Sequence, residues 1–196
     1  MQTDLFGNPT SGLPEGFRYG ANVVPKTMQD ELLVEFANLP FKAFDFHGFE
    51  GKRRVVSYGW KYDFNSASLR MAEGIPPFLY PLRTLAADFA GLSTDRLRHV
   101  LISEYDTGAP IGWHRDKAVF GVVIGVSFLS SCTFRLRRRT GDKWERISIV
   151  VEPGSIYVLS GPARTVWEHS IPPVDQLRYS ITFRELINDS AERSTA

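Results

Sequence analysis

Apolar residues along this chain follow helical spacing in two segments and strand-like alternation in most of the others. The first helical segment is expected to run from Thr27, its predicted N-cap, to Leu39, because Pro40 stops it. Its apolar face comprises Met28, Leu32, Leu33 and Phe36. A second helix is expected between Pro77 and Gly91. Its apolar face comprises Leu82, Leu85, Ala86 and Phe89.

Short β-branched or aromatic segments separated by Gly, Pro or Asp turns make up most of the remaining chain, which is typical of strands. The predicted strands are Arg54–Tyr58, His99–Tyr105, Val119–Leu129, Thr133–Arg138, Arg146–Val151, Ile156–Leu159, Thr165–His169 and Tyr179–Arg184. Helices that come first, with most strands after them, indicate an α+β protein that is mainly β. A β-sandwich or jelly roll flanked by N-terminal helices fits this order.

The length of 196 residues suits one domain with a sizeable core. We expect a flexible N-terminal arm over residues 1–16, a single domain over residues 17–187 and a polar tail over residues 188–196. The formal net charge of +1 does not favour a globally basic nucleic-acid binder, so a polyanion would have to bind a local basic patch.

Cysteine content and hydropathy bear on the compartment. Cys132 is the only cysteine, so no internal disulfide can form and nothing indicates an oxidising environment. The longest apolar run, Ala118 to Leu129, is shorter than the roughly 20 residues that cross a bilayer. The N-terminus lacks the basic and apolar regions of a secretory signal. We therefore expect a cytoplasmic protein that is a monomer and has no membrane span.

His114, Asp116 and His169 form the clearest pattern of metal-ligating residues in the chain. On an extended backbone, the side chains of His114 and Asp116 would share one face while Arg115 points away. The third ligand must come from elsewhere in the fold, and His169 is the candidate. Two imidazoles and a carboxylate can occupy one face of Fe(II), leaving the other open for a co-substrate and O2. Zinc accepts the same ligands, so a zinc hydrolase is the alternative.

Arg178 and Arg184 follow the second histidine and are expected to lie on one face of a strand, with Ser180 and Thr182 between them. Guanidiniums and hydroxyls in a row are costly to bury without an anionic partner. Arg178 could hold a carboxylate in a bidentate fork, with a hydrogen bond added by Ser180. Solvated arginines on an exposed strand are the alternative. Next to the metal pattern, the row favours a dicarboxylate site and a non-haem Fe(II) oxygenase over a zinc enzyme.

At these residues the chain resembles the AlkB family of Fe(II)- and 2-oxoglutarate-dependent dioxygenases. The matching stretches are RRVVSYGWKYDF, LISEYDTGAPIGWHRD, PGSIYVLSGPARTVWEHSIP and RYSITFR, which together cover about residues 53 to 184. The resemblance implies a double-stranded β-helix (jelly roll) core, O2 as oxidant, and catalytic iron ligands at His114, Asp116 and His169. It implies that Arg178 and Tyr105 hold the distal carboxylate of 2-oxoglutarate and that Arg184 lies near the metal. Ser103 and Ser180 stand where the family often has Asn and would supply shorter hydrogen-bonding groups.

Two groups of residues could contact an alkylated nucleic acid. Arg135 and Arg137 begin a basic hairpin around Thr140-Gly141-Asp142, which could bind phosphates or could merely keep an edge strand soluble. An aromatic row could stack a flipped base, although alternating aromatics more often pack in a sheet. The row comprises Tyr58, Trp60 and Tyr62.

The N-terminal peptide Gln2–Phe6 resembles the short motif by which bacterial proteins dock on the replication sliding clamp, although Leu5 and Phe6 could instead pack on the chain's own core.

The leading hypothesis is oxidative demethylation of alkylated DNA or RNA. A hydroxylase or demethylase of a protein or small molecule is the first rival. It is favoured by Ala118, where some DNA-repair members carry an acidic residue that reads the damaged base. A non-catalytic jelly-roll binding module is the second rival.

Overall fold

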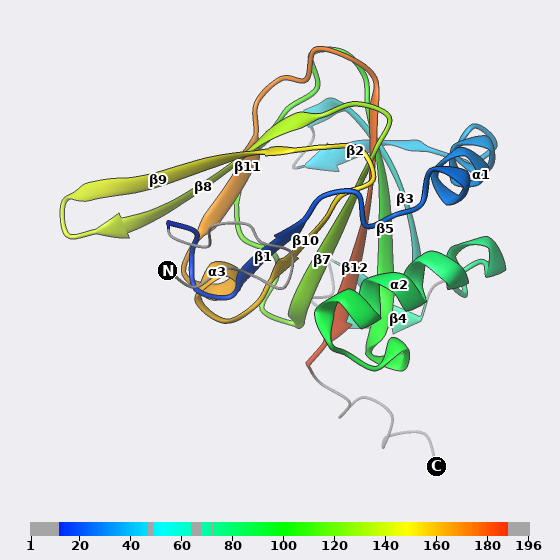
Figure 1. Ribbon diagram of the computed structural model, residues 1–196, viewed down its shortest axis with the longest axis horizontal. Coiled ribbons are helices and arrows are strands. Elements are labelled where there is room, and N and C mark those ends of the chain that lie inside the picture. Colours follow the sequence, from blue (N-terminus) through cyan, green and yellow to red (C-terminus); the bar gives the residue numbers. More distant parts are fainter. Residues whose placement is uncertain (1–11, 47–48, 64–67, 72, 188–196) are drawn as a thin grey trace.

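The computed structural model describes residues 12–46, 49–63, 68–71 and 73–187. Within them, two antiparallel sheets face each other, and two helices cover the outer face of the larger sheet (Figure 1). This arrangement confirms the predicted fold class, a mainly β α+β protein with a jelly-roll core and helices near its N-terminus.

The larger sheet has eight strands in the order β1-β10-β7-β12-β5-β3-β2, with β4 paired to β3. Strands far apart in sequence are therefore neighbours, and β12 lies between β7 and β5. The strands are β1 (Phe17–Gly20), β2 (Lys42–Phe46), β3 (Phe49–Asp63), β4 (Ser68–Met71), β5 (Leu97–Tyr105), β7 (Phe120–Phe128), β10 (Ile156–Leu159) and β12 (Arg178–Leu186).

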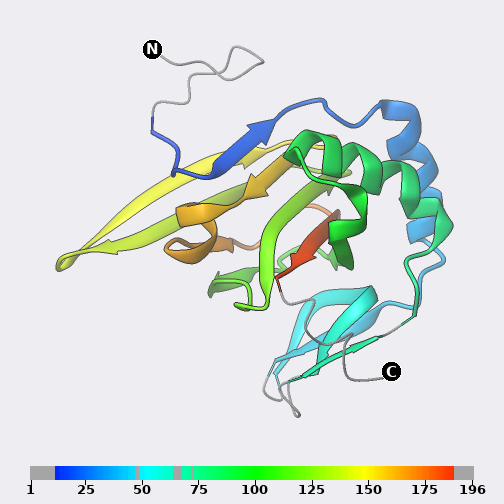
Figure 2. The same cartoon turned by 90° about the horizontal axis from the view of Figure 1, so that it is seen from below.

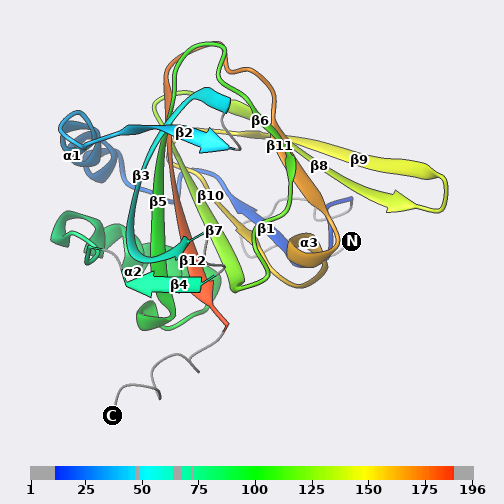
Figure 3. The ribbon, with the colours of Figure 1, turned by 180° about the vertical axis from the view of Figure 1, so that it is seen from behind.

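The smaller sheet has four strands in the order β6-β11-β8-β9. Its strands are β6 (Ile111–His114), β8 (Cys132–Thr140), β9 (Lys143–Val151) and β11 (Glu168–Ile171). The β8–β9 hairpin projects well beyond the rest of the sheets, and β6 and β11 lie over the larger sheet (Figure 3).

The helices are α1 (Lys26–Phe36), α2 (Tyr80–Ala90) and α3 (Gly161–Thr165), with short 3-10 turns η1 (Pro77–Leu79) and η2 (Thr94–Arg96). Figure 2 shows α1 and α2 together on one side of the larger sheet. As predicted, α2 ends at Gly91, whose left-handed backbone (φ 69°) suits a glycine C-cap.

Hydrophobic side chains form two clusters, one on each face of the larger sheet. The first packs α1 and α2 against the sheet, with Phe36 meeting Phe128 edge-on at 5.5 Å between ring centroids. The second fills the space between the two sheets and includes Phe134, Tyr157 and Trp167. Strand alternation sends successive side chains of β5 and β12 to opposite faces of the larger sheet. Polar side chains facing the second cluster therefore line a site between the sheets.

Several sequence-based boundaries are wrong. Helix α1 begins after Pro25 rather than at a Thr27 cap, and it ends at Phe36. Pro fits the start of a helix because it has no N–H to satisfy, and Pro25 forms no side-chain cap bond. The expected strand Thr165–His169 is also wrong in its first half. Residues Gly161–Thr165 form a helical turn with a proline in its first positions, and β11 begins only at Glu168.

Residues 12–16, the described part of the predicted arm, contact the domain. Leu13 packs against the second cluster, and the Gly16 carbonyl accepts hydrogen bonds from Ser160. Residues Gln2–Phe6 and the predicted tail lie outside the described residues. None of the described helices combines the length and apolar character that a membrane span requires.

Candidate active site

His114 and His169 face each other across two paired strands. His114 ends β6, His169 is the second residue of β11, and the two are register partners. Their ring centroids are 4.2 Å apart. Nδ1 of His114 lies 2.9 Å from the Gly112 carbonyl oxygen, which orients the ring so that Nε2 is left to bind a ligand.

Asp116 lies beside the two histidines, but its backbone differs from the one expected. The extended backbone expected from His114 to Asp116 forms a strand only as far as His114, where β6 ends, and Asp116 follows in irregular backbone. Tertiary contacts hold this segment instead. Nε of Arg184 donates to Oδ1 of Asp116 at 2.8 Å, and buried Arg164 donates to the carbonyls of Lys117 and Phe120.

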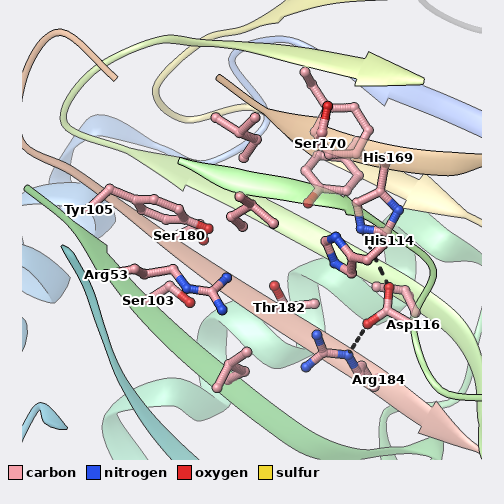
Figure 4. Close-up of a pocket in the computed structure, with 16 residues that line it drawn as sticks. Arg53, Ser103, Tyr105, His114, Asp116, His169, Ser170, Ser180, Thr182 and Arg184 are labelled. Atoms are coloured by element: carbon pink, nitrogen blue, oxygen red, sulfur yellow. Dashed lines mark hydrogen bonds and ion pairs between the residues drawn. The ribbon is translucent and has the colours of Figure 1, made fainter. Parts of the chain in front are cut away.

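One ligand atom from each of His114, Asp116 and His169 lies within 4.8 Å of the others (Figure 4). Nε2 of His169 is 3.7 Å from Oδ2 of Asp116. That Oδ2 is buried and has no hydrogen-bond partner. A buried carboxylate oxygen without a partner is costly, and a cation between it and the two imidazoles would satisfy it. The residues present therefore fit an Fe(II) ion held by two His and one Asp.

The protonation states also suit a metal. Burial, followed by the neighbouring His114, lowers the pKa of His169 to about 3. Burial likewise lowers the pKa of His114. Burial alone would raise the pKa of Asp116, but Arg184 and the histidines hold it well below its usual range. At neutral pH, both imidazoles are neutral and the carboxylate is ionised, as metal ligands must be.

Arg178 is almost fully buried, at 1% exposed. Its Nε and Nη2 donate to Oγ of Ser127 at 3.2 and 3.1 Å, while its Nη1 is buried without a partner. The guanidinium carbon lies 4.9 Å from the centre of the Tyr105 ring. A buried guanidinium with an unused N–H is suited to a carboxylate partner, as expected from the sequence.

Tyr105 lies between two guanidiniums. It is the register partner of Arg178 on β12 and of Arg53 on β3. Ser180 donates to its hydroxyl at 3.4 Å. Burial would raise the pKa of Tyr105, but Arg53 and Arg178 hold it below its ordinary value. The three side chains form a cationic, hydrogen-bonding end of the site.

The pocket between the sheets contains most of the predicted residues. The backbone alternation predicted for β12 is present, because Ser180, Thr182 and Arg184 line the pocket while Tyr179, Ile181 and Phe183 join the first cluster. Arg178 contacts lining residues without lining the pocket itself. The lining comprises Arg53, Leu101, Ser103, Tyr105, Ile111, His114, Asp116, Val123, Phe134, Tyr157, His169, Ser170, Ile171, Ser180, Thr182 and Arg184.

Sequence reasoning missed Arg53, Ser127 and Tyr157. Arg53 sits in the pocket wall, Ser127 holds Arg178, and Tyr157 lines the pocket from β10. Ser127 carried a detectable signal, since it is a polar residue inside the apolar run of β7. Arg53 and Tyr157 carried none, because only strand register brings them to the site.

Four of the five predicted substrate residues lie outside the pocket wall, namely Tyr58, Trp60, Arg135 and Arg137. Tyr58 is 5% exposed and packs in the first cluster, which favours the sheet-packing alternative. Trp60 is partly buried beneath the guanidinium of Arg98, at 5.1 Å. Tyr62 is in β3, and its side chain lies outside the described part of the structure. Arg135 and Arg137 lie on β8 and contact Trp113, at 5.0 and 4.4 Å.

Comparisons with known proteins agree with this geometry. The family model of the 2OG-Fe(II) oxygenase superfamily matches residues 38–184. The uncharacterized protein L905 of Acanthamoeba polyphaga mimivirus is 30% identical over 106 residues, which is 47% of this chain and 50% of that protein. The Alkylated DNA repair protein ALKBH8 homolog of Arabidopsis thaliana is 25% identical over 146 residues, which is 62% of this chain and 42% of that protein.

The chain thus spans about half the length of the curated relatives it matches. The solved structure of OsALKBH1 superposes with a TM-score of 0.65 at 15% identity, covering 88% of this chain and 98% of that one. At this identity the likeness concerns the fold. Together with the family model, it confirms the AlkB-like resemblance seen in the sequence.

Proposed function

The chain belongs to the 2OG-Fe(II) oxygenase superfamily, and we propose that it is an Fe(II)- and 2-oxoglutarate-dependent dioxygenase that demethylates alkylated bases in DNA or RNA. One observation carries the oxygenase chemistry. The buried Oδ2 of Asp116, an acceptor without a partner, lies among the ligand atoms of His114 and His169, and Arg178 adds a buried donor without a partner, its Nη1.

In this proposal, His114, Asp116 and His169 hold the iron. When bound, iron and 2-oxoglutarate activate O2 and oxidise a substrate C–H bond, with 2-oxoglutarate converted to succinate and CO2. The carbonyl of Gly112 orients the His114 ring, and Arg184 orients the carboxylate of Asp116. These two contacts would keep the His114 ring and the Asp116 carboxylate directed at the position of the ion.

The cationic end of the pocket would bind the co-substrate. Arg178 offers its free Nη1 to the distal carboxylate, and Tyr105 offers its hydroxyl. Arg53 adds a second positive charge next to that hydroxyl. Ser103 and Ser180 line the same wall and supply further hydrogen-bonding groups. The apolar side chains between the sheets keep bulk water from the reacting carbon.

Two observations support a nucleic-acid substrate. The Arabidopsis relative is named as an alkylated DNA repair protein, and the basic β8–β9 hairpin carries a row of arginines. Hydroxylation of an N-methyl carbon gives a product that collapses to the free base and formaldehyde. Cytoplasmic location, a monomeric state and clamp docking through Gln2–Phe6 stay predictions of the sequence.

The test is a reaction of the purified protein with Fe(II), 2-oxoglutarate and an oligonucleotide that carries N-methylated bases. We expect succinate and formaldehyde in equal amounts, no formaldehyde from the unmethylated oligonucleotide, and neither product from His114→Ala. Succinate without formaldehyde from any methylated strand would favour the protein or small-molecule rival. Absence of both metal binding and succinate would remove the oxygenase proposal.

A further inference from the structure

Arginines and tryptophans alternate on the outer face of the smaller sheet. The guanidinium carbon of Arg137 lies 4.4 Å from the Trp113 ring centre and 4.2 Å from the Trp144 ring centre. Arg135 lies 5.0 Å from Trp113, and Arg139 lies 5.6 Å from Trp144. We call these five residues the Arg–Trp ladder. It connects β6, β8 and β9 across the face of β11, the strand between β6 and β8.

The ladder contacts residues adjacent to both candidate histidine ligands. Trp113 directly precedes His114 on β6, and Glu168 directly precedes His169 on β11. Arg137 stacks on Trp113 and donates from Nε to Oε2 of Glu168 at 2.6 Å. Successive strand residues point to opposite faces of a sheet. Arg137 therefore makes its contacts on the outer face of the smaller sheet, while the two imidazoles point into the pocket.

Arg135 adds a contact on the other side of His169. Its Nε donates at 3.0 Å to Oγ of Ser170, the residue after that histidine and a fully buried one. The backbone on both sides of His169 is thus held from β8. The Arg137–Glu168 pair is also largely removed from solvent, with side chains 22% and 27% exposed. Solvent therefore screens this pair less than it would screen a fully exposed one.

We propose that Arg137 is a positioning residue for the metal centre, fixing the backbone of β6 and β11 so that His114 and His169 present their nitrogens to one ion. This inference rests on the proposed function. The guanidinium of Arg137 is sandwiched between two rings, and its Nε already donates to Glu168. A phosphate would have to compete with these contacts. The exposed Arg139 and Arg146 are better placed for that purpose.

The test measures metal affinity directly, by anaerobic calorimetric titration with Mn²⁺. Arg137→Gln removes the charge and the stacking plane, and Arg137→Lys keeps the charge without the plane. We expect both to weaken Mn²⁺ binding by about 10-fold, the lower end of the effect of residues that orient metal ligands. The Fe(II) concentration needed for half-maximal activity should rise in parallel, while kcat at saturating Fe(II) stays near that of the wild type.

Arg138→Gln is the matched control. Arg138 is the next residue on β8, pairs with Glu145 and stacks on Trp167 at 4.9 Å, but contacts neither Trp113 nor Glu168 through any described interaction. It should leave Mn²⁺ affinity unchanged. Glu168→Gln, nearly isosteric, removes the ion pair and should weaken Mn²⁺ binding even if Arg137→Gln does not fold. Circular dichroism of the metal-free forms checks folding.

The outcomes separate the two proposals. A wild type that binds no Mn²⁺ would overturn the proposed function. A wild type that binds Mn²⁺, with Arg137→Lys and Glu168→Gln binding equally well, would overturn only the positioning role. An equal loss in Arg138→Gln would also overturn it, since the effect would then be general to the sheet. Weaker oligonucleotide binding by Arg137→Gln at unchanged Mn²⁺ affinity would reassign Arg137 to the substrate surface.

Discussion

Arg184 holds one oxygen of Asp116 and leaves the other to the metal centre. Its Nε donates to Oδ1 at 2.8 Å, and Oδ2 is buried without a partner at 3.7 Å from Nε2 of His169. Both side chains are largely buried, at 11% and 5% exposed, so this contact is shielded from solvent. Because Asp116 lies in irregular backbone, Arg184 supplies the orientation that a strand would otherwise give.

Arg184→Gln is therefore expected to weaken Mn²⁺ binding by about 10-fold, since the carboxylate loses its orienting partner. Arg184→Lys keeps the charge but not the planar fork and should recover only part of the affinity. Calorimetric titration measures both. Arg54→Gln is a suitable control because it removes another arginine–carboxylate pair, with Glu104, whose second oxygen accepts from Tyr179 of the first cluster. Full affinity in Arg184→Gln would show that the backbone alone orients Asp116.

Arg178→Met should abolish 2-oxoglutarate binding. At a concentration of 100 times its Kd, 2-oxoglutarate should stabilise the wild type by about 2.7 kcal/mol, and this gain should vanish in the variant. Without ligand, Arg178→Met is expected to be no less stable than the wild type, because a buried, incompletely bonded charge is replaced by an apolar side chain. Thermal unfolding with and without the co-substrate measures both effects. A loss in Arg53→Met instead of Arg178→Met would make Arg53 the carboxylate anchor.

Ser127 is expected to act through Arg178. Ser127→Ala removes the acceptor of Nε and Nη2, leaving them buried without that partner, at a cost of about 1–3 kcal/mol. The free energy of unfolding should fall by that amount, and 2-oxoglutarate affinity should fall several-fold. Ser155→Ala removes another fully buried serine, which donates to the Glu152 carbonyl, and should lower stability without changing co-substrate affinity. Urea unfolding and calorimetry distinguish the two. If both variants bound 2-oxoglutarate with the same affinity, Ser127 would not act on the co-substrate through Arg178.

The face of β12 could be predicted from the sequence because strand alternation is local. Any extended backbone sends Ser180 and Thr182 to the same side as the flanking arginines. His114 and His169 could be predicted because few residue types bind iron and the chain has four histidines. The pairing of β6 and β11 brings the two histidines together. The sequence identified them as ligands from their residue type alone, without that pairing.

Arg53 and Tyr157 could not be predicted, because register between distant strands decides which residues meet. Arg53, Tyr105 and Arg178 form one row across β3, β5 and β12, and a shift of one residue would send Arg53 to the helix-covered face. The irregular backbone at Asp116 could not be predicted for a related reason. The contacts that hold it come from Arg164 and Arg184, which are distant in sequence.

A glycine at position 125 is expected to be required for stability, because the ring of Tyr157 occupies the space that a side chain there would need. The two residues are register partners on β7 and β10, and a Cβ at Gly125 would overlap the end of the Tyr157 ring. Gly125→Ala should push that ring into the pocket, lowering stability by about 1–3 kcal/mol through overpacking. It should also weaken 2-oxoglutarate binding, since Tyr157 lines the pocket.

A double-mutant cycle separates this clash from other effects of Gly125→Ala. Tyr157→Val removes the overlapping atoms, so the double variant should be more stable than the sum of the single changes predicts, with a coupling of about 0.5–3 kcal/mol. Gly74→Ala, where a Cβ would meet open space, should change stability by less than about 0.5 kcal/mol. Urea unfolding measures the free energies of unfolding of the four proteins in the cycle and of Gly74→Ala. Strict additivity of Gly125→Ala and Tyr157→Val would mean that the strand, and not the tyrosine ring, excludes a side chain at this position.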